Sequence, residues 1–87
     1  MQSEISKMII KRFLSAFEYL KAERITNKSE FCNKYGIDRR NFYKLEKSTR
    51  TAIELSWIYH LCVDYNVSAK WIITGEGDFL EKRAKNV

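Results

Sequence analysis

Apolar residues recur at helical spacing along most of this chain. In the first quarter they lie three or four positions apart, at Ile5, Ile9, Phe13, Ala16 and Leu20, with Phe17 beside them. Residues at this spacing share one face of a helix, and the positions between them are mostly polar. The pattern predicts a long amphipathic helix over about residues 4–23.

Two shorter helical patterns follow in residues 28–47, KSEFCNKYGIDRRNFYKLEK. Asn27 begins a capping box with Glu30 at the third helical position, which predicts a second helix up to about residue 35. Gly36 supplies the left-handed backbone on which a helix commonly ends, and Asp38 is a candidate N-cap for a third helix over about residues 39–47. Two helices joined this tightly cross at a steep angle, as in a helix-turn-helix.

The remainder of the chain predicts two more helices after a polar loop at residues 48–50. Thr51 begins T-A-I-E, a second capping box, ahead of a helix with one apolar face at Leu55, Ile58, Cys62 and Tyr65. Ser68 caps a short fifth helix, S-A-K-W-I-I-T, which Gly75 and Gly77 end. No run of alternating apolar residues suggests strands. The fold class predicted is all-α, with five helices in a single small domain.

The motif in residues 28–47 resembles the helix-turn-helix of the lambda-repressor and Cro-like families. The resemblance rests on a small residue after the first apolar position, a glycine in the turn, and an apolar series at Phe31, Tyr35, Ile37, Phe42 and Leu45. A second stretch, 67–77 (VSAKWIITGEG), resembles the string that often closes the DNA-binding domain of xenobiotic-response-element-type regulators. The resemblance therefore implies a five-helix, lambda-repressor-like DNA-binding domain over residues 1–77, followed by a tail at 78–87.

A helical wheel of the third helix separates a buried side from an outward side. Phe42 and Leu45 define the buried side, and the outward side is basic and aromatic. The residues expected to reach base edges are Arg39, Arg40, Tyr43 and Lys44. Those expected to contact the phosphate backbone are Lys28, Ser29, Lys47, Thr49, Arg50 and Thr51. The alternative for each is an ordinary solvated surface residue.

Charge is distributed unevenly along the chain. The net formal charge is +5, yet residues 28–50 carry seven basic and three acidic side chains, whereas residues 51–81 carry one basic and five acidic. Such polarity orients a protein toward a phosphate backbone before contact. Composition alone, with 45% apolar and 31% charged residues, is that of an ordinary globular domain.

Catalysis and metal binding find little support in the sequence. Cys32 and Cys62 lack metal-ligand spacing and are interpreted as reduced core residues. His60 has no acidic or cysteine partner at a convincing spacing, so it is a surface or partly buried residue rather than a ligand. We expect no enzyme activity, no cofactor and no metal. The longest nearly apolar run is far too short for a membrane span, and with no signal peptide the expected location is cytoplasmic.

Three consecutive apolar residues, Trp71, Ile72 and Ile73, cannot all face one side of a short helix. Either the excess forms a homodimer interface together with the tail, or Phe79 and Leu80 fold back and cover it. The sequence thus predicts a small transcriptional regulator or repressor that binds double-stranded DNA through its major groove, as a homodimer. The alternative is a protein-interaction module of the same fold, such as an antitoxin or a partner-binding subunit.

Overall fold

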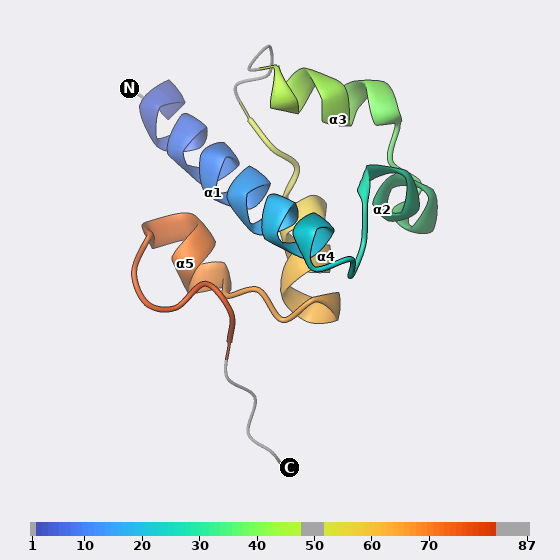
Figure 1. Ribbon diagram of the computed structural model, residues 1–87. Helices are drawn as coiled ribbons and strands as arrows, with labels where there is room; N and C mark the ends of the chain where they lie inside the picture. Colours follow the sequence, from blue (N-terminus) through green and yellow to red (C-terminus); the bar gives the residue numbers. More distant parts are fainter. Residues whose placement is uncertain (1, 48–51, 82–87) are drawn as a thin grey trace.

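A computed structural model of the chain describes residues 2–47 and 52–81 (Figure 1). Within these residues it has five helices and no strand, which confirms the predicted fold class at that level. The helices are α1 (Gln2–Ala22), α2 (Lys28–Tyr35), α3 (Arg39–Glu46), α4 (Leu55–Asp64) and α5 (Ala69–Thr74). Helix α1 packs beside α5, α2 beside α3, and α4 beside α5.

Three of the predicted N-caps are present. The side chains of Asn27, Asp38 and Ser68 accept hydrogen bonds from backbone N–H groups in the first turns of α2, α3 and α5. Each of these bonds satisfies an N–H group that has no partner within its own helix. The local sequence therefore sets the starts of these three helices correctly.

The predicted start of α4 is wrong. A capping box beginning at Thr51 would place Glu54 in the first turn, but the helix begins at Leu55 and Glu54 is itself the N-cap, without a side-chain hydrogen bond. Thr51 lies outside the described residues, and residues 52–54 are not helical. Glutamate is a poor capping residue, so burial of the following apolar residues must determine where α4 begins.

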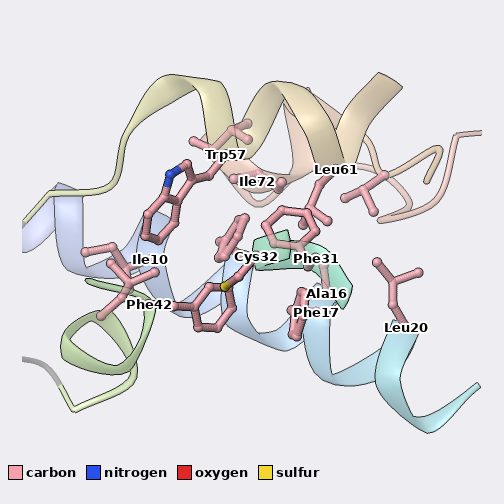
Figure 2. Close-up of a cluster of buried hydrophobic side chains, with 14 residues drawn as sticks. Ile10, Ala16, Phe17, Leu20, Phe31, Cys32, Phe42, Trp57, Leu61 and Ile72 are labelled. Carbon is pink, nitrogen blue, oxygen red and sulfur yellow. The ribbon is translucent and has the colours of Figure 1, made fainter. Parts of the chain in front are cut away.

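The core is a cluster of aromatic rings contributed by four helices. Phe17 of α1 lies 5.0 Å from Phe42 of α3 between ring centroids, and Phe31 of α2 lies 5.3 Å from Phe17. Trp57 of α4 stacks on Phe42 at 5.7 Å with an interplanar angle of 13°. These labelled rings converge in Figure 2. Because each ring touches rings from other helices, the cluster fixes how α1, α2, α3 and α4 are arranged.

Two predicted apolar faces are confirmed only in part. In α1 Phe13, Ala16, Phe17 and Leu20 are buried as predicted, and in α4 Ile58 is buried as predicted. In α1 the buried residue of the first turns is Ile10, whereas Ile5 is exposed. Each step of four residues rotates the side-chain direction by about 40° around the helix axis, so Ile5 no longer lies on the side of α1 that carries Phe13. In α4 the buried residues are Trp57, Ile58 and Leu61, whereas Leu55 is exposed.

Arg12 ties α5 to α1. Its Nη1 donates to the carbonyl oxygens of Ile72 (3.0 Å) and Ile73 (3.3 Å), near the C-terminal end of α5. Gly75 follows with a left-handed backbone (φ 79°), and a Cβ built there would lie 2.8 Å from Arg12 Nη2. The left-handed backbone therefore favours glycine at position 75, and a side chain there would have to displace the Arg12 guanidinium.

The segment after Gly77 folds back onto the domain. The ring of Phe79 lies 4.9 Å from that of Tyr19 and 5.3 Å from that of Trp71, and Leu80 is half-buried against the core. The backbone N–H of Ser68 donates to the carbonyl oxygen of Phe79 at 2.8 Å. Of the two arrangements that the sequence left open, the structure therefore has the one in which Phe79 and Leu80 fold back over α5. Of the three consecutive apolar residues 71–73, only Ile73 stays exposed.

Candidate nucleic-acid interface

Helix α3 presents one buried face and one exposed face. Phe42 and Leu45 are buried, and four exposed side chains together line a shallow depression on the opposite side of the helix. These four residues, here called the α3 basic face, are Arg40, Tyr43, Lys44 and Lys47. The sequence placed all four on the outward side, and the structure brings them together. Helix α3 lies along an edge of the molecule, beside α2 and away from α5 (Figure 1).

Within the α3 basic face, Tyr43 and Lys47 form a unit. The ammonium nitrogen of Lys47 lies 5.4 Å from the centroid of the Tyr43 ring, a cation–π distance. Both side chains remain exposed. The contact holds an aromatic surface and a positive charge next to each other, a pairing suited to a ligand with both flat apolar groups and anionic groups.

Arg39 lies at the flank of the face and connects the starts of α2 and α3. Its Nη1 donates to Ser29 Oγ at 2.9 Å. Accepting this bond leaves the Ser29 hydroxyl proton able to donate elsewhere. The sequence assigned Arg39 to bases and Ser29 to the phosphate backbone without indicating that the two touch. Their hydrogen bond places both candidate functions at one corner of the molecule.

Lys28 forms an intramolecular ion pair between two helices. Its Nζ lies 2.8 Å from Glu46 Oε1, with the two side chains 39% and 29% exposed. The bond joins the first residue of α2 to the last residue of α3. The sequence listed Lys28 as a phosphate contact and did not single out Glu46. A carboxylate at the C-terminal end of a helix is unfavourable without a cation nearby, which is the signal that could have identified the pair.

The turn between α2 and α3 consists of residues 36–38. Gly36 has a left-handed backbone (φ 66°), and its N–H bonds to the carbonyl oxygen of Cys32. Asp38 accepts from the backbone N–H of Arg40 at 2.9 Å, and its Oδ1 lies 3.9 Å from Arg40 Nε. These hydrogen bonds fix the position of the first turn of α3, while the Arg40 side chain stays exposed.

Three further candidates, Thr49, Arg50 and Thr51, lie outside the described residues. The described candidates all precede that gap, and they define the candidate interface: α2 contributes Ser29, and α3 contributes Arg39 and the α3 basic face.

His60 is half-buried and stacks on Tyr35, with ring centroids 3.8 Å apart and an interplanar angle of 12°. The Tyr35 hydroxyl donates to Asp64 Oδ2. Burial, together with this hydrogen bond, raises the pKa of Tyr35 above its ordinary value of 10.0. Tyr35 therefore links α2 to α4 as a neutral phenol.

The cysteines are ordinary packing residues. Cys32 is buried and Cys62 half-buried, and in both cases burial raises the pKa of the thiol. A raised pKa disfavours the nucleophilic thiolate. Among residues 2–47 and 52–81, no group of three or more His, Cys, Asp or Glu side chains is arranged to hold a metal ion.

Comparison of the chain with known protein families, with curated proteins and with solved structures finds no match. Of the helices in the described part of the chain, none has the length and apolar character needed to cross a membrane. The structure defines the class to which the chain belongs: a small domain of five helices around an aromatic core.

Proposed function

We propose that this chain binds duplex DNA in a sequence-specific manner and acts as a small cytoplasmic transcriptional regulator, most simply a repressor. In this proposal α2, the turn at 36–38 and α3 form a helix-turn-helix, and α3 enters the major groove. The observation that carries the proposal is the α3 basic face. Three cations and one tyrosine are exposed together on a helix whose opposite face is held in an aromatic core.

Arg40 is the leading candidate for base recognition. It lies in the first turn of α3, where recognition helices present side chains to base edges, and its guanidinium can bond O6 and N7 of guanine together. Tyr43 and Lys44 lie one turn further along, where the tyrosine ring can contact a thymine methyl group and the ammonium group can donate to a base acceptor.

Ser29, Arg39 and Lys47 are the candidates for positioning the protein on the phosphate backbone. The Ser29–Arg39 pair lies at the N-terminal end of α2, where backbone N–H groups and the helix dipole also favour an anion. Lys28 contributes indirectly, because its ion pair with Glu46 holds α2 against α3. These contacts supply salt-dependent affinity rather than sequence recognition.

The charge distribution supports the same orientation. Among the described residues, 28–47 carry six basic and three acidic side chains, whereas 52–81 carry one basic and five acidic. A duplex therefore attracts the α2–α3 side and repels the α4–α5 side before any contact is made.

Selection from a random duplex library tests the proposal, followed by affinity measurements against salt on the selected and an unrelated sequence. We expect enrichment of a defined sequence. The slope of log K against log salt should be at least as steep as about −2, because Arg39 and Lys47, the two cations assigned to phosphates, give about 0.9 each. No enrichment, with an affinity insensitive to salt, would reject DNA binding and favour the protein-interaction module of the same fold.

A further inference from the structure

Two lysines of α1 lie beside the C-terminal turn of α3. Lys7 and Lys11, here called the α1 lysine pair, are exposed, and they line one depression together with the buried Leu45 of α3. They are four residues apart, so they lie on the same side of α1. Leu45 directly follows Lys44 of the α3 basic face, which places the pair close to the end of that face. In Figure 1 the N-terminal half of α1 lies toward the C-terminal end of α3, whereas α2 joins its N-terminal end.

The charges of the α1 lysine pair are not neutralised within the described part of the protein. Neither ammonium group forms an ion pair with a described residue, whereas Lys28 is paired with Glu46. Glu4 is the one acidic residue among those that line the depression, so the depression keeps a net positive charge. Two like charges four residues apart on a helix repel one another, and an anion bound between them relieves that repulsion.

The basic charge of α1 is concentrated in the half of the helix that lies near α3. Residues 2–14 carry three basic side chains and one acidic side chain, whereas residues 15–22 carry one of each. The third basic residue of the first half is Arg12, which is bonded to the carbonyl oxygens at the end of α5. The α1 lysine pair therefore supplies the cations of this half that can meet an external anion, and it extends the positive surface of residues 28–47 beyond α3.

We propose that the α1 lysine pair contacts the phosphate backbone of the duplex beyond the C-terminal end of α3, an inference that rests on the proposed DNA binding. A helix with its side chains is about 10–12 Å across and fills a major groove about 12 Å wide, so neighbouring elements meet the phosphates that border the groove. The Ser29–Arg39 pair lies at the N-terminal end of α3, and the α1 lysine pair lies at the other end. Phosphate contacts at both ends fix the register and orientation of α3 on the duplex.

The chemistry of lysine assigns this pair to affinity rather than to base recognition. An ammonium group is a point charge on a flexible stem, and it lacks the rigid fork with which arginine bonds O6 and N7 of guanine. A phosphate contact of this kind strengthens binding to every sequence and makes the affinity more sensitive to salt. The inference therefore concerns the salt dependence of DNA binding, whereas the choice of sequence is assigned to α3.

The test measures the affinity of the whole chain for a selected and an unrelated duplex by fluorescence anisotropy at several salt concentrations. Lys7→Ala and Lys11→Ala remove one ammonium group each, a double variant removes both, and Lys11→Arg keeps the charge. Lys70→Ala is the matched control, because Lys70 is also an exposed helical lysine but belongs to α5, which lies away from α3 (Figure 1). Alanine favours helix, so the variants should keep the fold, and circular dichroism melting checks that they do.

We expect Lys7→Ala and Lys11→Ala each to weaken binding to both duplexes by roughly fivefold to tenfold at about 0.1 M salt, and each to make the salt slope shallower by about one unit. The double variant should lose about two units of slope, because each phosphate contact contributes about 0.9. Lys11→Arg and Lys70→Ala should match the wild type, and every variant should keep the preference for the selected duplex.

Two results would overturn the inference and leave DNA binding standing. One is a double variant whose salt slope equals that of Lys70→Ala. The other is a loss in Lys11→Arg as large as that in Lys11→Ala, because the positive charge would then not be what binds. A wild type with no salt-dependent affinity for either duplex would reject the proposed function, and the role of the α1 lysine pair with it.

Discussion

Helices α3 and α4 have the same kind of inner face and opposite outer faces. On the inside each contributes one large aromatic residue, Phe42 and Trp57, and the two rings stack 5.7 Å apart. On the outside α3 carries the α3 basic face, whereas α4 carries the exposed apolar residues Leu55, Tyr59 and Val63. The buried faces account for how the two helices pack, while the outer faces differ in the kind of surface that each helix presents to solvent.

The largest effects on stability are expected when the stacking of Phe42 on Trp57 in the core is removed. Phe42→Ala and Trp57→Ala remove side chains that are 0% and 3% exposed, and each should cost about 3–5 kcal/mol of stability. Native domains have about 5–15 kcal/mol in total, so each variant should lose a large part of its stability.

Tyr43→Ala is the control on the outer face of α3 and should change stability by less than about 0.5 kcal/mol. Urea denaturation followed by circular dichroism measures all three variants. A Phe42→Ala midpoint equal to that of the wild type would show that α3 is not packed as described.

Helices α3 and α4 also differ in their N-caps, and changes at the two caps should have smaller effects on stability than the core substitutions. Asp38 caps α3 with a side-chain hydrogen bond, whereas Glu54 precedes α4 without one. Asp38→Ala should therefore lower the free energy of unfolding by about 1 kcal/mol, and Glu54→Ala should leave it within about 0.5 kcal/mol. Equal losses in the two variants, measured by urea denaturation, would contradict this difference between the caps.

The smallest effect concerns Tyr35, which joins the α2–α3 pair to α4 through Asp64 and His60. Tyr35→Phe keeps the ring but removes the hydroxyl, and it should cost about 0.5 kcal/mol at neutral pH, the low end for a hydrogen bond, because this bond is exposed.

The same change should alter the alkaline behaviour of the domain. The pKa of Tyr35 is raised in the folded state, so its contribution is fully present below pH 10.0 and is lost as pH rises above it, because only the unfolded state then ionises. Thermal melting from pH 9 to pH 11 should show a shallower loss of stability in Tyr35→Phe. Identical pH profiles for the two proteins would rule out this linkage.

Local signals in the sequence predicted most of the fold. Asn27, Asp38 and Ser68 each precede a helix that begins where the cap indicates, and Gly36 and Gly75 each end one. These residues act through hydrogen bonds and backbone angles within a few positions, which a sequence displays directly.

The failures share a physical cause. In α4 apolar residues occupy most of the circumference of the helix, and only Ser56, His60 and Asp64 form a polar side. The sequence therefore offers little contrast from which to choose the buried side, and Leu55 was predicted to be buried where Trp57 and Leu61 are found. The packing of α1, α3 and α5 against α4 determines which side of α4 is buried. The predicted start of α4 was wrong because burial of the apolar residues from Leu55 onward outweighs a weak local signal.

For the candidate site, the sequence predicted which side of α3 is exposed but not the contacts that its residues make. A helical wheel anchored on Phe42 and Leu45 placed the α3 basic face correctly. The Arg39–Ser29 hydrogen bond and the Lys28–Glu46 ion pair cross between helices, at separations of ten and eighteen residues. Such contacts depend on the angle between α2 and α3, which no local pattern specifies.

The most direct test of the central claim is to compare two positions on the α3 basic face, each on a selected duplex and on an unrelated one. Arg40→Ala should cost about 1–3 kcal/mol on the selected duplex and much less on the unrelated one, because it removes base recognition. Lys47→Ala should weaken binding to both duplexes similarly and reduce the salt slope by about one unit.

Both variants should melt at the wild-type temperature, since both side chains are exposed. The measurement is fluorescence anisotropy at several salt concentrations. The account predicts that the preference for the selected duplex falls in Arg40→Ala and persists in Lys47→Ala. An unchanged preference in Arg40→Ala would contradict the claim that α3 reads bases.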